Sequence, residues 1–269
     1  GVTRVVAAAP DPHPRNRGAG FDLLEAAGIE VIRDGNQAGA RALNPGHEKT
    51  HTQGRPYVRL KLAATMDGFT GLPNGQSQWI TSPAARLEVQ RLRAQSSAIV
   101  TGANTVLSDD PELTVRDPRI DPLYSDLILA RPKPVYVLDS QSRTMATAKV
   151  YGNPLARQVC GLETLNDHPT ALKTKLNPDG QIDLPLFFDA LAGKGVLEVL
   201  VECGPTLAGA VMQANLVDEL VLFLAPKFMG MGKPLLQLPE LDKMSDLRAW
   251  SLSDTRRIGP DLKLVLKPD

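Results

Sequence analysis

The stretch Val196–Leu216, VLEVLVECGPTLAGAVMQANL, predicts a buried strand, a tight turn and the start of a helix. Its first part is apolar and rich in β-branched residues, as expected of a strand covered on both faces. Glu202 ends this strand, and Gly204 and Pro205 form the turn. Thr206 then offers a hydroxyl to the free N–H groups of the following helix. These groups and the helix dipole predict an anion site that fits a diphosphate, although an ordinary α/β connection without a ligand stays an alternative.

The composition is that of an ordinary globular protein. Of the 269 residues, 42% are hydrophobic and 22% are charged, which predicts one large domain or one domain with an appendage. The formal net charge is zero, so nothing predicts a nucleic acid or a membrane surface as partner. No apolar run approaches the roughly 20 residues of a membrane span, and Cys160 and Cys203 are too few for a structural zinc site. We expect a cytoplasmic protein.

The beginning of the chain predicts a small β-α-β unit followed by a connector. Its strands are Val2–Ala9 and Ile29–Ile32, and Phe21–Ala27 has helical spacing. In the connector, His47 and His51 can share a helix face and bind a metal. Flanking Pro and Gly residues argue against a helix there and no third ligand is near in sequence, so a solvated linker is the competing interpretation. The chain opens directly on a strand, and we therefore expect an upstream part of this unit to be missing.

A larger α/β unit follows. Short apolar runs predict its strands, which are Tyr57–Ala64, Ala98–Thr101, Pro134–Leu138, Glu219–Leu224 and Leu262–Leu266. Ser82 starts a helix after the first of them, and residues 166–183 form a polar excursion. Strands alternating with helices imply a mostly parallel sheet, which binds ligands outside the carboxyl ends of its strands. Trp79, Asp109 and Ser140 follow such strand ends and are expected to converge there.

Several motifs in series carry a family resemblance. They are LKLAATMDGFTG (60–71), GQSQWITSP (75–83), SSAIVTGANTVLSDDPELTVR (96–116), VLDSQSR (137–143) and VECGPTLAGAVMQANLVDELVLFLAPKFMG (201–230). In order and spacing, residues 55–269 resemble the reductase domain of the bifunctional riboflavin-biosynthesis pyrimidine deaminase/reductases of the RibD type. Residues 1–50 resemble the last piece of that family's deaminase domain. The family's His-Ala-Glu motif and Pro-Cys pair, which supply its zinc ligands, are absent here, so we expect no deamination from this chain alone and zinc only in a missing upstream half.

The resemblance implies a dihydrofolate-reductase-like, three-layer α/β/α reductase domain, preceded by a β-α-β remnant of a cytidine-deaminase-like domain. It implies NADPH-dependent reduction of 5-amino-6-(5-phospho-D-ribosylamino)uracil to the ribityl compound. It also implies a homodimer through the reductase domain, with Glu219–Leu224 as a candidate interface element. Two alternatives stay open, namely a related reductase of another pyrimidine or pterin and a nucleotide-binding module without turnover. The sequence itself does not separate NADPH from NADH.

The resemblance also implies roles for single residues. Catalytic roles fall to Asp109, Lys61 and Glu202. Substrate binding falls to Ser77, Arg93, Leu113, Arg116 and Glu202. Cofactor contacts fall to Ala63, Trp79, Thr105, Asp109, Ser140, Gly204, Pro205, Thr206, Leu207, Ala208, Gly209 and Ala210. No residue is assigned to a metal.

Each of these roles agrees with side-chain chemistry but competes with a structural one. Two arginine forks suit a substrate phosphate. Asp109 can relay a proton as a hydride arrives, or it caps the turn before Pro111. Lys61 can polarise the substrate, or it is an edge lysine whose head reaches water. Trp79 can pack on a nicotinamide, or it anchors its loop in the core. Asp67 is expected to shape its turn and Cys203 to be a packing residue.

Overall fold

The computed structural model describes residues 1–166 and 168–269, so Asp167 of the predicted polar excursion lies outside the described residues. The chain divides into two compact units. The smaller unit comprises Gly1–Tyr57 and Phe188–Leu197, and the larger unit comprises Val58–Phe187 and Glu198–Asp269. The predicted division into residues 1–50 and 55–269 stays a prediction.

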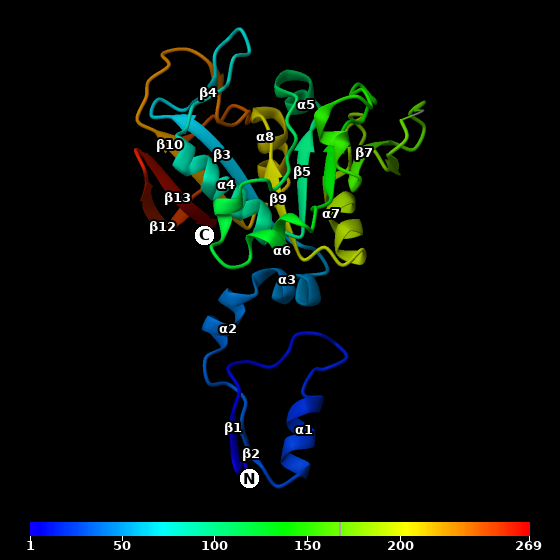
Figure 1. Ribbon diagram of the computed structural model, residues 1–269, viewed down its shortest axis with the longest axis vertical. Helices are drawn as coiled ribbons and strands as arrows, with labels where there is room; N and C mark the ends of the chain where they lie inside the picture. The colour runs from blue at the N-terminus through cyan, green and yellow to red at the C-terminus, as the bar shows by residue number, and fades with distance from the viewer. Residues whose placement is uncertain (167) are drawn as a thin grey trace. The chain divides into compact units, whose positions relative to one another are not determined.

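Strands and helices alternate through most of the chain (Figure 1). The strands are β1 (Arg4–Val6), β2 (Glu30–Ile32), β3 (Tyr57–Thr65), β4 (Phe69–Gly71), β5 (Ala98–Gly102), β6 (Val135–Leu138), β7 (Ala156–Gly161), β8 (Ala171–Thr174), β9 (Glu198–Glu202), β10 (Glu219–Ala225), β11 (Lys233–Pro234), β12 (Trp250–Ile258) and β13 (Asp261–Pro268). The α-helices are α1 (Ala19–Ala26), α2 (Gln37–Leu43), α3 (Pro45–Gln53), α4 (Pro83–Gln95), α5 (Ala103–Asp109), α6 (Ser125–Leu129), α7 (Leu184–Gly193) and α8 (Pro205–Gln213). Short 3-10 turns are η1 (Pro118–Ile120), η2 (Lys149–Gly152) and η3 (Met244–Asp246).

Within the described residues, a nine-stranded sheet forms the centre of the molecule's larger unit, in the order β12-β13-β10-β3-β9-β5-β6-β7-β8. β10 is parallel to β3, and pairing stays parallel from β9 across β5, β6 and β7 to β8. At one side of this sheet, β13 pairs antiparallel with both β10 and β12, and the separate two-stranded sheet β11-β4 is also antiparallel. The predicted α/β class with a mostly parallel sheet is confirmed. The two-strand sheet β1-β2, also parallel, belongs to the smaller unit.

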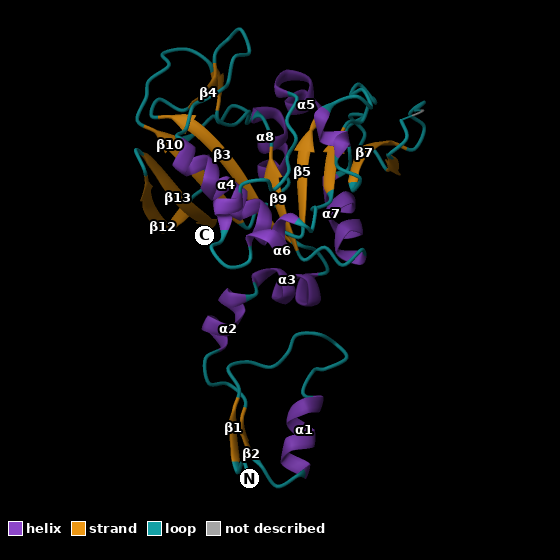
Figure 2. Ribbon diagram, in the orientation of Figure 1, coloured by secondary structure: helices purple, strands orange, loops and turns teal. Residues whose placement is uncertain are grey.

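Helices cover both faces of the large sheet (Figure 2). On one face, apolar residues of α4 pack against residues of β9 and β10, and this core consists of Ala85, Val89, Leu92, Leu200, Val221 and Phe223. Burial of each large member stabilises the fold by about 1.5–3 kcal/mol relative to leaving it exposed. Tyr136 of β6 points to the opposite face from its neighbours Val135 and Val137, because side chains alternate along a strand. Its ring meets that of Phe187 in α7 edge-on, with centroids 5.8 Å apart.

The helix α3 corrects the prediction of a non-helical linker around the two histidines. Pro45 occupies its first position, where the missing N–H costs nothing, and Gly54 ends it with φ of 74° in the left-handed region. The residues that argued against a helix therefore delimit one. His47 and His51 share a face, with ring centroids 4.6 Å apart, and His13 lies 4.4 Å from His51. Even so, no group of three side chains among the described residues is arranged to hold a metal ion.

The strand β10 has neighbours on both of its edges, β3 and β13. It therefore offers no free backbone edge to a second chain, which weakens the prediction that Glu219–Leu224 forms an interface. The outermost strand beyond β10 and β13 is β12, and most of its residues are exposed. The sequence analysis missed β12 because it lacks the buried apolar run that identified the other strands. Over residues 1–166 and 168–269, no helix has the length and apolar character needed to cross a membrane.

Candidate active site

A cleft of about 1300 Å³ opens at the carboxyl ends of the central strands. Its lining includes residues at or near the carboxyl ends of several strands, such as Ala63 of β3, Gly102 of β5, Leu138 of β6 and Glu202 of β9. Pockets for one drug-sized ligand usually measure about 300–1,000 Å³. The cleft is therefore large enough for a dinucleotide and a second ligand side by side.

The predicted site residues converge on this cleft, with two exceptions. Those that line it are Lys61, Ala63, Ser77, Trp79, Arg93, Thr105, Asp109, Leu113, Arg116, Ser140, Glu202, Gly204, Pro205, Thr206, Leu207 and Ala210. Ala208 and Gly209 are buried in α8 instead and do not line it. A Cβ at Gly209 would lie 1.9 Å from the carbonyl oxygen of Gln237, so Gly209 permits close packing of two backbones rather than a ligand contact.

The turn before α8 presents unpaired backbone donors to the cleft. Gly204 is the N-cap and its N–H donates to Thr105 Oγ1 at 3.2 Å. The prediction that Thr206 caps the helix is wrong, because its hydroxyl donates to Gln237 Oε1 at 3.0 Å. In the part of the chain described, the N–H groups of Thr206 and Leu207 consequently have no protein acceptor. Together with the helix dipole, these donors are arranged in a way that suits an anion, and the anion site stays a prediction.

Arg93 and Glu202 form a buried, two-pronged ion pair that the sequence did not reveal. Arg93 Nε donates to Glu202 Oε1 at 2.5 Å and Nη2 donates to Oε2 at 3.0 Å, and both side chains are at most 10% exposed. Burial opposes ionisation of Glu202, but the guanidinium overcomes it and holds the pKa of this carboxyl below its usual value. Arg93 Nη1 also donates to the carbonyl oxygen of Thr114 at 3.0 Å.

This pairing changes the predicted division of roles. Arg93 does not extend a free charge into the cleft, because Glu202 neutralises it and orients it. Arg116 does, since its side chain is 52% exposed and only a long 3.6 Å ion pair joins it to Glu112. Such an exposed pair contributes little. The buried amide of Gln90 accepts from the Arg116 backbone N–H at 2.9 Å and holds the residue at the cleft.

Lys61 is held inside the sheet rather than at its edge. Its strand β3 lies between β10 and β9, so the alternative of an edge lysine is excluded. Burial lowers the pKa of the ammonium group, and nearby Glu202 opposes that shift. A lysine with a lowered pKa exchanges protons more readily near neutrality than an ordinary one.

We expect the stability cost of Lys61 to depend on pH. Because its pKa is lower in the folded than in the unfolded protein, the unfolded protein binds more protons between the two values. The contribution of Lys61 to the free energy of unfolding should therefore become more favourable as pH rises from its folded-state pKa to its unfolded-state pKa near 10.5. Urea denaturation of the parent and of Lys61→Met measures this effect, and the stability advantage of the methionine variant should shrink as pH rises from 7 to about 10. A difference that is constant with pH would contradict it.

Asp109 and Ser77 both line the cleft, and Ser77 Oγ donates to Asp109 Oδ1 at 2.9 Å. The alternative role of Asp109, capping the turn, is taken by the adjacent Asp110. Asp110 takes the left-handed C-cap position with φ of 39° and accepts from the Lys149 backbone N–H at 2.8 Å. Asp109 is thus left with its carboxylate in the cleft, as a catalytic role requires.

Trp79 is 61% exposed, which excludes the alternative of a core anchor. The guanidinium of Arg86 stacks 4.5 Å from its ring centroid, so one face of the indole is covered by a cation. Lys227 Nζ donates to the Trp79 carbonyl oxygen at 3.2 Å. Asp67 in turn accepts from the backbone of residues 229–230 at 2.9 and 2.7 Å, which agrees with its predicted role in shaping a loop.

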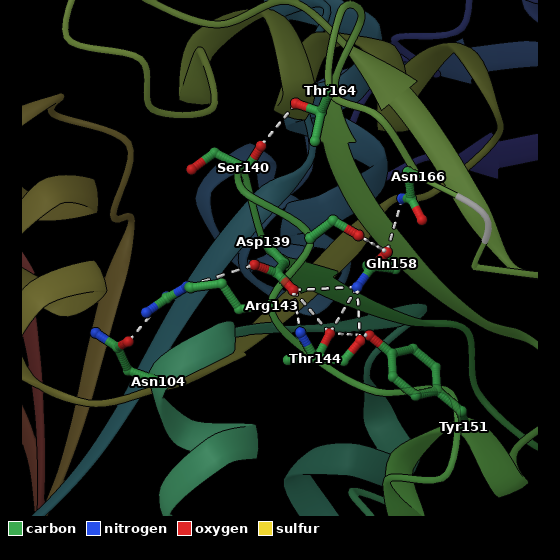
Figure 3. A network of polar contacts seen from close by, with 10 residues as sticks. Asn104, Asp139, Ser140, Arg143, Thr144, Tyr151, Gln158, Thr164 and Asn166 are labelled. Carbon is green, nitrogen blue, oxygen red and sulfur yellow. Dashed lines mark hydrogen bonds and ion pairs between the residues drawn. The ribbon is translucent and has the colours of Figure 1, made fainter.

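The sequence analysis overlooked three residues that the structure places at or beneath the cleft, namely Asn104, Asp139 and Arg143. Asn104 and Arg143 line it, and Asp139 is buried with its Oδ1 atom 3.8 Å from Arg143 Nε (Figure 3). The signal available was the polar run DSQSR immediately after a buried strand. Polar residues at the carboxyl end of a parallel strand are ligand candidates as a group.

Taken together, the sheet order and the cleft define an α/β reductase of the dihydrofolate-reductase-like type, with a turn of free backbone donors beside an acid, a lysine and an arginine. A family model described as RibD C-terminal domain matches residues 56–264. The chain belongs to the RibD family of riboflavin biosynthesis and carries its pyrimidine reductase domain.

Relatives match the chain along nearly its whole length. The riboflavin biosynthesis protein RibD of Escherichia coli (strain K12) is 42% identical over 277 residues, which cover 99% of this chain and 74% of the relative. The RibD of Haemophilus influenzae is 36% identical, and the match covers 100% of this chain and 73% of that relative. The solved structure of Acinetobacter baumannii RibD, form 1, superimposes with a TM-score of 0.87 at 32% identity, covering 100% of this chain and 73% of that one.

A structure from Thermotoga maritima also matches, with a TM-score of 0.82 at 25% identity over 100% of this chain and 72% of that one. It is described as a diaminohydroxyphosphoribosylaminopyrimidine deaminase/5-amino-6-(5-phosphoribosylamino)uracil reductase.

Proposed function

We propose that this chain uses NADPH to reduce 5-amino-6-(5-phospho-D-ribosylamino)uracil to its ribityl product. One observation carries the proposal, namely that a single cleft joins the anion-binding turn at Gly204 to Lys61, Asp109 and Arg116. The described activity of the Thermotoga relative supports the choice of substrate. The deaminase step is not proposed, since the sequence lacks the zinc motifs.

The described residues fit a phosphate-bearing dinucleotide. The free N–H groups of Thr206 and Leu207 suit the diphosphate. Ala63 has no bulk that would block the cleft floor, and the exposed indole of Trp79 offers a flat surface to a nicotinamide ring. Thr105 links the two sides, because it accepts from Gly204 and follows β5. When bound, NADPH supplies a hydride.

The chain's own residues provide orientation and proton transfer. Arg116 holds the substrate phosphate. Glu202 orients Arg93, whose remaining N–H groups are available to the same phosphate. The sugar ring opens to an imine, its carbon C1 accepts the hydride and its nitrogen accepts a proton. Lys61 or Asp109 lies where such a proton can be delivered, and Ser77 holds the Asp109 carboxylate in place.

The purified protein, mixed with NADPH and the ribosylaminouracil phosphate, tests the proposal. We expect one NADPH to be oxidised for each ribityl product formed. The loss of absorbance of the reduced nicotinamide measures the NADPH, and mass spectrometry measures the product. Tight NADPH binding without turnover would favour the nucleotide-binding module. Turnover of a dephosphorylated pyrimidine or a pterin at equal efficiency would favour the alternative reductase.

We propose in addition that the chain forms a homodimer through the reductase domain. The exposed outer strand β12 of the large sheet is the element best suited to such pairing, because its backbone edge has no neighbour within the described residues. Analytical ultracentrifugation across protein concentration measures the stoichiometry, and a monomer at all concentrations would exclude the dimer.

A further inference from the structure

We infer that Lys227 is a positioning residue for cofactor binding, because its ammonium group holds the backbone of Trp79 and Ile80 in the wall of the cleft. The inference rests on the proposed function, in which the Trp79 indole lies against the nicotinamide, and it adds a residue from a remote part of the chain. Lys227 follows β10 by two positions, in the connection to β11, and does not itself line the cleft.

The segment that Lys227 holds has no backbone pairing of its own. Residues 77–81, which we call the Trp79 segment, belong to the connection between β4 and α4, and all five line the cleft. Among the described residues, no hydrogen bond between backbone groups involves this segment. Backbone groups without such bonds are satisfied by side chains or by water. The position of the Trp79 indole therefore depends on side chains that reach the segment from other elements.

Lys227 supplies two of these contacts. Its Nζ donates to the Ile80 carbonyl oxygen at 2.7 Å and to the Trp79 carbonyl oxygen at 3.2 Å. An ammonium group has three donors, so one lysine can hold two successive carbonyl oxygens. Hydrogen bonds from a charged donor are stronger than those between neutral groups. Since the indole is attached to one of these two residues, fixing both carbonyl groups restricts the directions in which the ring can lie.

The backbone of Lys227 is itself held by the large sheet and the adjoining loop. Its carbonyl oxygen accepts from the N–H of Met66, directly after β3, at 2.9 Å, and its N–H donates to the Ala225 carbonyl oxygen at 2.7 Å. The carboxylate of Asp67 accepts from the N–H groups of residues 229–230 at 2.9 and 2.7 Å. The lysine therefore extends from a well-anchored backbone toward a segment that has few bonds of its own.

Arg86 of α4 holds the same segment by a different route. Its Nη1 donates to the Thr81 carbonyl oxygen at 2.8 Å, while its guanidinium lies 4.5 Å from the centroid of the Trp79 ring. Three successive carbonyl oxygens thus accept from two cations that belong to different elements. Arg86 covers one face of the ring, and Lys227 fixes the backbone that carries the ring.

The Lys227→Met variant tests the inference. Methionine keeps most of the apolar stem but has no donor, so the Trp79 segment loses two contacts. We expect the dissociation constant for NADPH, measured by isothermal titration calorimetry, to rise about 3- to 10-fold. In steady-state assays KM for NADPH should rise by a similar factor, while kcat at saturating NADPH should change by less than about twofold. This split is expected of a residue that acts on binding.

The fluorescence of Trp79 gives a second readout that needs no turnover. The chain has two tryptophans, so Trp250→Phe leaves Trp79 as the single emitter. In that background we expect Lys227→Met to raise the rate constant for quenching by acrylamide in the free protein, because a loosened segment exposes more of the indole. The circular dichroism spectrum should stay that of the parent, which separates a local change from general unfolding.

Two further variants control for the loss of a positive charge. Lys227→Arg restores charged donors, so the NADPH affinity and the quenching of Trp79 should return to within about twofold of the parent. Lys243 is an exposed lysine in the same stretch between β10 and β12, and it lies outside the cleft. Lys243→Met is therefore the matched control and should leave both quantities unchanged.

The inference requires both effects of Lys227→Met. If either the NADPH affinity or the quenching of Trp79 is unchanged in that variant, the inference is wrong and the proposed reductase remains. A fall in kcat with an unaltered KM would also overturn it, since Lys227 would then act on the chemical step. Absence of NADPH binding to the parent protein would refute the proposed function and the inference together.

Discussion

The Glu202→Ala variant is expected to lose about 3–5 kcal/mol of the free energy of unfolding, the usual cost of leaving one partner of a buried ion pair alone. The reason is that Arg93 stays buried, with its two strongest acceptors removed. Urea denaturation followed by circular dichroism measures the change. The loss should be largest near neutral pH. Since the pKa of Glu202 is lowered by folding, its contribution is present above the unfolded value and disappears as pH falls through the folded value.

The double variant Arg93→Met with Glu202→Leu is the control. Replacing both charges by apolar side chains of similar volume leaves no unpaired ion, so stability should return close to that of the parent. The double variant should nevertheless lack reductase activity, because neither the oriented guanidinium nor the carboxylate remains. A single variant that is destabilised by less than about 1 kcal/mol would show that the pair is solvated.

The Asp109→Asn variant is expected to lower kcat by about 10²- to 10⁴-fold, the range for removal of a general acid or base. Asparagine keeps the shape and can still accept from Ser77 Oγ, so the cleft should keep its geometry. NADPH affinity, measured by calorimetry, should change by less than about threefold. This separates proton transfer from binding.

Asp110→Asn is the matched control for that experiment. Asp110 is the adjacent carboxylate, but its side chain accepts from the Lys149 backbone N–H and forms the helix end. We expect turnover within about threefold of the parent. If Asp109→Asn also retains turnover, the proton comes from Lys61 or from water, and the catalytic role of Asp109 is excluded.

Much of the fold could be predicted because its elements depend on local patterns. The strand ending at Glu202 is identified by its apolar run, and α4 by Ser82, which accepts from the Ala85 N–H at 3.3 Å. Elements that lack such a local pattern were not predicted. β12 is an exposed outer strand without an apolar run, and α3 is polar and begins with a proline.

The family resemblance extended the prediction to the site, and sixteen of its residues line one cleft. What it could not supply was how these residues share their charges. Arg93 and Glu202 were both assigned to the substrate as independent contacts. Although they are 109 positions apart in sequence, they form one ion pair. The pair exists because α4 crosses the face of the sheet where β9 ends.

The sequence by itself determined the parallel α/β class, the strand, turn and helix around Glu202 and the family, since each depends on residue order within a short stretch or a series of motifs. The tertiary structure decided which side chains are neutralised and which stay free for a ligand. Arg93 is paired, whereas Arg116 and Arg143 face the cleft. Strand order and helix packing set these distances, and no local pattern encodes them. The electrostatics of the cleft therefore appear only once β9, β5 and β6 lie side by side.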